Sequence, residues 1–129
     1  MATIDIAHDQ LHIDLKWYEK VFAWRGTLSV PLLHIASAEV GAEIPEAVGV
    51  GGHFHGTYVP GSRLEGTKDH ADGSHSFFDV RDPKNAVTIH LKHDEYKKLV
   101  VEVEDRDPKE VAEWITKAVQ TAREAAGKA

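Results

Sequence analysis

The chain contains no cysteine and only one methionine among its 129 residues. The absence of cysteine excludes a disulfide framework, a thiol nucleophile and any cysteine ligand for a metal ion. It also fits a protein that works in a reducing compartment, so we expect a cytoplasmic location.

Positive charge is scarce as well. The 15 lysines and arginines stand against 21 aspartates and glutamates, which gives a formal net charge of −6 with the histidines neutral. Nucleic acids and anionic lipid surfaces bind to basic protein faces. The composition therefore argues against nucleic acid and against a lipid surface as partners.

Long apolar runs are also absent. A membrane-spanning helix needs about 20 consecutive apolar residues, and no such run occurs in this chain. The first ten residues, MATIDIAHDQ, have neither the basic region nor the apolar region of a signal peptide. We expect one globular domain over residues 1–129, without membrane insertion.

Most of the sequence consists of short segments in which apolar and polar residues alternate, with turn residues about every ten positions, as in β-strands. Because no helical segment separates most of them, we expect antiparallel pairing and about seven strands. Asp72-Gly73 is a strong hairpin turn signal. Further turns are predicted at His8-Asp9-Gln10 and Pro60-Gly61, and a loop is predicted over Gly41–Gly52. Nine candidate segments show the pattern, more than the strand number that we expect, and they are Thr3–Ala7, Leu11–Leu15, Thr27–Val30, Leu33–Val40, Phe54–Val59, Leu64–Thr67, His75–Val80, Ala86–Leu91 and Leu99–Val103.

Two helices are predicted. Asp107 and Pro108 form a helix start signal, with Asp107 as the cap and Pro108 in the first turn. An apolar stripe at helical spacing follows: Val111, Trp114, Ile115, Ala118, Val119 and Ala122. A shorter helix is predicted over Lys16–Trp24. The whole pattern indicates a mainly β or α+β fold, an antiparallel barrel capped by one C-terminal amphipathic helix.

The segments PLLHIASAEV, GGHFHGTYVPGS, SFFDVRDPKNAVTIHL and YKKLVVEVEDRDPKEVAEWI resemble the small actinobacterial proteins with a pleckstrin-homology-like fold. The resemblance covers Leu11 to Ile115, and its most specific element is the strand with Phe77-Phe78-Asp79-Val80. It implies a seven-stranded bent barrel capped by one C-terminal helix, and it implies no catalytic residue. The chain departs from the family in its middle loops, which carry histidine where arginine and glycine are expected.

Histidines suggest a metal site. His53 and His55 lie two apart on a strand, so both imidazoles point to the same face. His70 and His75 flank the predicted hairpin turn and would join them if the two strands are neighbours, with Glu65, Asp69 or Asp72 as a further ligand. Nitrogen and carboxylate ligands suit divalent Zn, Ni, Cu or Fe. The alternative is that these are solvated loop histidines on an acidic protein.

Asp79 is a second candidate site residue. On a strand, Phe77 and Asp79 share one face, so either Asp79 is buried or Phe77 is exposed. A buried carboxylate needs a partner, which Arg63 or Arg81 can supply. Asp79 is therefore either half of a structural ion pair or an acid–base carboxylate in an apolar pocket.

These observations favour a non-catalytic binding module. Its ligand is a peptide or a small molecule held by the loops around His53–Ser74, with Arg63, Phe77, Asp79 and Arg81 as ligand-binding residues, or a peptide added to a sheet edge. The alternative is a metal-dependent or acid–base enzyme that uses His53, His55, His70 and His75, with Asp79 as the base. A homo-oligomer formed through Trp17–Trp24 or a sheet edge is a further hypothesis.

Overall fold

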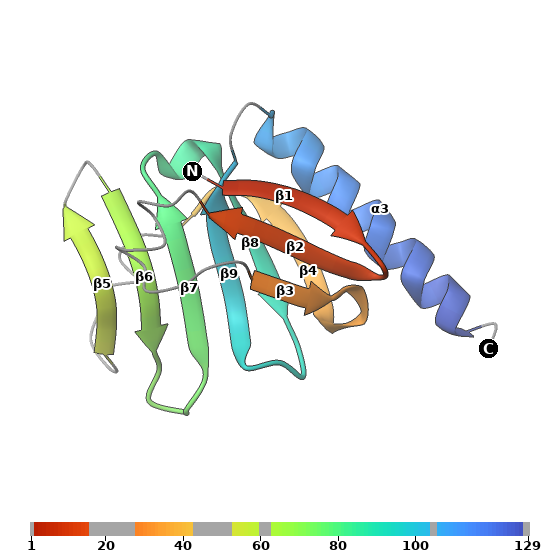
Figure 1. Ribbon diagram of the computed structural model, residues 1–129, viewed down its shortest axis with the longest axis horizontal. Helices are drawn as coiled ribbons and strands as arrows, with labels where there is room; N and C mark the ends of the chain where they lie inside the picture. Colours follow the sequence, from red (N-terminus) through yellow and green to blue (C-terminus); the bar gives the residue numbers. More distant parts are fainter. Residues whose placement is uncertain (1, 16–27, 43–52, 60–62, 104–105, 128–129) are drawn as a thin grey trace.

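The computed structural model describes residues 2–15, 28–42, 53–59, 63–103 and 106–127, which form two β-sheets and one long helix (Figure 1). The predicted helix over Lys16–Trp24, the Pro60-Gly61 turn and most of the Gly41–Gly52 loop lie outside these residues. Within the described part of the chain, no helix is both long and apolar enough to cross a membrane.

The first sheet has three antiparallel strands, in the order β1 (Ala2–Ala7), β2 (Gln10–Leu15) and β3 (Leu28–Pro31). The hairpin between β1 and β2 turns at His8 and Asp9, which both have a positive φ. A two-residue turn of this kind matches the twist of the two strands. The predicted turn at His8-Asp9-Gln10 is thus confirmed.

The second sheet has six strands in the order β4-β8-β9-β7-β6-β5. Most of them match predicted segments within one or two residues, and short 3₁₀ turns at Leu32–His34 and Pro83–Asn85 precede β4 and β8. The strands are β4 (Ile35–Val40), β5 (His53–Val59), β6 (Arg63–Asp69), β7 (His75–Val80), β8 (Ala86–Leu91) and β9 (Tyr96–Glu102).

The expectation of a closed, seven-stranded, all-antiparallel barrel is wrong. The described residues form nine strands in two open sheets, and β7 pairs with β9 in parallel. Two parallel strands need a crossover connection between them. Here the chain passes from β7 to β9 through β8, which pairs with the edge of β9 that faces away from β7. The coarser prediction of a mainly β fold with one C-terminal helix is confirmed.

The C-terminal helix, α3 (Pro108–Gly127), begins as predicted. The Asp107 Oδ1 atom accepts a hydrogen bond from the Lys109 backbone N–H at 3.0 Å, which satisfies one free amide of the first turn. Its buried residues are Val111, Ala112, Ile115 and Val119. They pack next to β4 and join the main core.

The six-stranded sheet buries apolar residues on both faces. On its inner face, Phe77, Ile89 and Leu99 belong to the main core, together with residues of the three-stranded sheet and α3. On its outer face, Leu64, Phe78, Val80, Ala86 and Val100 form a second cluster. Consecutive residues of a strand point to opposite faces of the sheet, and here both faces are covered. Phe77 and Phe78 are therefore both buried, and β7 carries a continuous apolar run.

β5 and β6 approach each other very closely at one point. Gly56 and Gly66 are register partners, and both have a positive φ of 143° and 153°. A Cβ atom added to Gly66 would lie 2.8 Å from the Gly56 Cα and would overlap the His55 carbonyl oxygen. Only glycine fits where the two strands approach this closely, and the contact sets the position of β5 relative to β6 at this end of the sheet.

Candidate functional site

The inner face carries a polar cluster beyond the main core, where β5 and β6 extend past the three-stranded sheet (Figure 1). The Asp69 carboxylate bonds to two imidazoles at once. Oδ2 lies 2.8 Å from His55 Nε2, and Oδ1 lies 2.7 Å from His75 Nδ1. His75 also packs edge-on against Tyr96, with ring centroids 6.2 Å apart. We call His55, Asp69 and His75 the His–Asp cluster.

The pKa of Asp69 lies below the ordinary value of 3.8. Desolvation by itself would raise this pKa, but the hydrogen bonds from His75 and His55 and the attraction of both rings outweigh it. The pKa of Asp72 is lowered too, because the Ser74 hydroxyl and backbone N–H donate to its carboxylate within the predicted turn. Asp72 therefore stabilises the hairpin turn.

The four histidines of the metal hypothesis are divided between two faces. His55 and His75 meet at Asp69, and the His53 ring lies 6.3 Å from that of His55. His70 instead places its Nε2 atom 2.7 Å from the hydroxyl of Ser76, which lies on the outer face of the six-stranded sheet. The residues that the structure describes contain no group of three or more His, Cys, Asp or Glu arranged to hold a metal ion.

Asp79 and Phe77 are both buried. Of the two possibilities that the sequence left open, a buried Asp79 or an exposed Phe77, the structure has the buried carboxylate. Asp79 is 1% exposed, and its register partner on β6 is Glu65, which is fully buried. The pairing follows from a hairpin centred on Asp72, so the turn signal contained the information needed to place Glu65 beside Asp79.

The other predicted ligand-binding residues lie apart. Phe77 lies in the main core rather than on a surface. Arg81 is exposed at the end of β7, where its backbone N–H donates to Glu102 Oε1 at 2.8 Å. Arg63 begins β6 and is half-buried opposite Val59.

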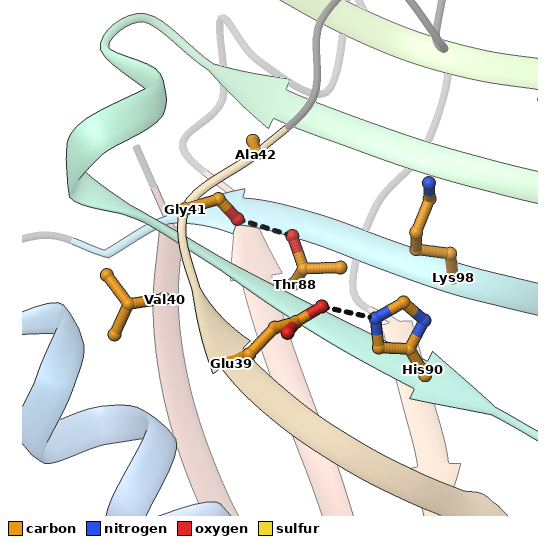
Figure 2. Close-up of a pocket in the computed structure, with 7 residues that line it drawn as sticks. All are labelled: Glu39, Val40, Gly41, Ala42, Thr88, His90 and Lys98. Carbon is orange, nitrogen blue, oxygen red and sulfur yellow. Dashed lines mark hydrogen bonds and ion pairs between the residues drawn. The ribbon is translucent and has the colours of Figure 1, made fainter.

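A pocket of about 370 Å³ opens on the outer face, at the β4 end of the sheet (Figure 2). The Thr88 hydroxyl donates to the Gly41 carbonyl at 2.6 Å, and His90 Nε2 lies 2.7 Å from Glu39 Oε1. The Lys98 side chain points away from the Glu39–His90 pair. The pocket is lined by Glu39, Val40, Gly41, Ala42, Thr88, His90 and Lys98.

Sequence reasoning did not single out this pocket. The one feature of the sequence that indicated this pocket is the pair Lys97-Lys98 within β9. Neighbouring residues on a strand point to opposite faces of the sheet, so one of the two lysines must face the interior or a pocket. Lys97 is exposed and Lys98 is 7% exposed. Which lysine is buried depends on the register of β9 with β7 and β8.

Two further hollows lie between β4 and α3, with volumes of about 350 and 390 Å³. The first is lined by residues 35–38 of β4 and by residues of α3, where Arg123 donates to the Ile35 carbonyl at 2.9 Å. Of these three hollows, the outer-face pocket is the one whose lining includes a histidine, His90.

No protein-family model, curated protein or solved structure matches this chain. The resemblance to pleckstrin-homology-like proteins therefore stays a prediction, and the function has to be argued from the geometry.

Proposed function

We propose that the protein is a non-catalytic binding module that holds a small molecule or a peptide side chain in the outer-face pocket. The observation that carries the proposal is a hollow of about 370 Å³ whose lining includes the polar residues Glu39, Thr88, His90 and Lys98. Ligand pockets have volumes of about 300–1,000 Å³ and use a few fixed polar groups for specificity.

The polar groups of the pocket are held in place before a ligand arrives. Glu39 and His90 orient each other across β4 and β8, and Thr88 is fixed by its bond to Gly41. Preorganised groups lose little conformational entropy on binding, so more of the interaction energy appears as affinity.

The alternative, an enzyme built on His53, His55, His70 and His75, has less support. Two of its imidazoles are engaged by Asp69, and His70 bonds to Ser76. The resemblance to the pleckstrin-homology-like family, which implies no catalytic residue, also favours the binding module.

A thermal-shift screen with small polar compounds tests the proposal. Compounds that raise the melting temperature of the wild-type protein should have little effect on Lys98→Met, because that change removes the buried ammonium of the pocket. The matched control is Lys97→Met, an exposed lysine one residue away. Binding that is unchanged in Lys98→Met, or a screen in which no compound stabilises the wild type, would contradict the proposed function.

A further inference from the structure

The two hollows between β4 and α3 adjoin each other along one edge of the six-stranded sheet. Ala38 and Thr116 line both of them. Together they follow β4 from Ile35 to Val40, which is about 17 Å of extended chain. Their other wall is one face of α3, since it includes Lys109 and Thr116, which are two helical turns apart. We call the combined hollow the β4–α3 groove.

The strand that lines this groove has an edge with backbone groups available for pairing. Within the described residues, the one strand that pairs with β4 is β8. In an antiparallel pair, residues bonded to the neighbouring strand alternate with residues whose N–H and C=O point the other way. The Gly41 N–H donates to the Ala86 carbonyl at 2.8 Å, so Gly41 and Glu39 face β8. The backbone groups of Ala38 and Val40 therefore point away from β8, to the edge of the sheet.

Arg123 occupies only the start of this edge. Its Nη2 atom donates to the Ile35 carbonyl at 2.9 Å and to the Ala36 carbonyl at 3.4 Å, next to the irregular step between Ile35 and Ser37. Beyond that step, no hydrogen bond in the described part of the chain uses the edge-facing backbone groups of β4. Residues 37–40 also lack the lysine or proline that often protects an edge strand from pairing.

The groove carries positive charge on an acidic protein. Lys109 and Lys117 are exposed in its lining, and no hydrogen bond or ion pair among the described residues uses their ammonium groups. Glu113 is the one acidic residue that α3 contributes to the lining. The Glu39 side chain points to the outer-face pocket instead (Figure 2). An acidic partner is thus complementary to the helical wall of the groove.

From these observations we infer that the protein binds an acidic peptide in an extended conformation, which adds a strand to the edge of β4 and lies in the β4–α3 groove. The peptide backbone bonds to Ala38 and Val40, and its alternate side chains face α3. An apolar side chain covers Val40, which is 46% exposed, and carboxylates reach Lys109 and Lys117.

A second copy of the chain suits this edge less well, because its own α3 would bring the same lysines to the contact. The inference is independent of the proposed function, since it uses the edge of β4 and one face of α3 rather than the polar groups of the outer-face pocket.

Selection from a random heptapeptide phage library on the immobilised protein supplies the probe. Enriched peptides should alternate Asp or Glu with apolar residues, and the affinity of the synthesised peptides should fall at high salt. A library that gives no enriched peptide, or enriched peptides that are neutral or basic, would overturn the inference.

Amide hydrogen exchange of the ¹⁵N-labelled protein then locates the peptide. In the free protein, the Ala38 and Val40 amides should exchange fast, while Glu39 and Gly41 are protected by β8. An enriched peptide should slow exchange at Ala38 and Val40 at least about tenfold. Protection that appears at β5 instead would refute the site. Protection of Ala38 and Val40 that grows with protein concentration alone would show that a second copy is the occupant, which also refutes it.

Variants test the backbone and the charge separately, with affinity measured by calorimetry. Val40→Pro removes an edge-facing N–H that β8 does not use, and it should weaken peptide binding at least about tenfold. Val40→Thr keeps this N–H and the side-chain shape, and it should stay within about threefold of the wild type. Unchanged binding in folded Val40→Pro would refute strand addition.

The charge variants also decide the matter if Val40→Pro does not fold. Lys109→Glu/Lys117→Glu changes exposed residues of α3 and should weaken binding at least about tenfold. Lys92→Glu/Lys97→Glu makes the same change in net charge outside the groove and should have an effect of no more than about twofold. Equal losses in the two double variants, or no loss in either, would count against the groove as the binding site.

Discussion

Asp69 links three strands through one carboxylate, since its imidazole partners come from β5 and β7 while it lies on β6. The sequence placed these residues near one another, because the Asp72-Gly73 turn brings Asp69 opposite His75. The sequence could not predict that the Asp69 carboxylate would bond to both imidazoles, because these contacts depend on the rotamers of three side chains from three strands.

The lowered pKa of Asp69 predicts how stability depends on pH. A carboxyl group whose pKa is lower in the folded than in the unfolded protein stabilises the fold above the unfolded pKa, and this contribution is lost as the pH falls through the folded value. The stabilising effect should thus be complete above the ordinary value of 3.8 and should decline below it.

Asp69→Asn tests this prediction. The carboxylate is 39% exposed, so solvent screening limits the expected loss to about 0.5–1 kcal/mol of unfolding free energy near neutral pH. Urea denaturation of both proteins across the acid range should show the difference shrinking below the ordinary pKa. Asp5→Asn, which changes an exposed carboxylate on β1 outside the cluster, is the comparison variant. A difference that grows with acid would contradict the account.

At the scale of secondary-structure elements, the β5–β6 hairpin depends on the contact between Gly56 and Gly66. Gly66→Ala should destabilise the protein by about 2 kcal/mol or more, because the new Cβ overlaps the backbone of β5 in a conformation that alanine rarely adopts. Gly127→Ala, at the open end of α3, should change the stability by less than about 0.5 kcal/mol. Equal melting temperatures for Gly66→Ala and the wild type would contradict the described approach of the strands.

Elements with local signals were predictable, and elements set by distant contacts were not. The start of α3 follows from Asp107 and Pro108, and the first hairpin follows from its turn residues. The position of β9 between β7 and β8 is decided by which apolar faces fit together, and alternation within Tyr96–Glu102 does not encode it. For the same reason the sequence did not reveal that Lys98 lines a pocket.

At the scale of the whole molecule, the open six-stranded sheet with a parallel β7–β9 pair replaces the expected barrel. Its two faces carry different polar groups, with the His–Asp cluster on the inner face and the pocket lined by Glu39, His90 and Lys98 on the outer face. A barrel of the same strands would turn one face into a closed interior, whereas an open sheet leaves room for a pocket at the β4 end.

Interstrand NOEs between backbone protons test this topology. Contacts should join Phe77 to Leu99 and Phe78 to Val100 in the pattern of parallel strands, and β8 should contact β9 in the antiparallel pattern. Direct NOEs between β7 and β8 would show instead that consecutive strands pair, as the barrel requires.

The central claim is that the outer face of the six-stranded sheet, and not the His–Asp cluster, is the ligand site. A crystal structure of the protein with a stabilising compound from the thermal-shift screen tests it most directly. The account predicts electron density for the compound among Thr88, His90 and Lys98. Density for the compound at His55, Asp69 and His75, with the outer-face pocket empty, would contradict it.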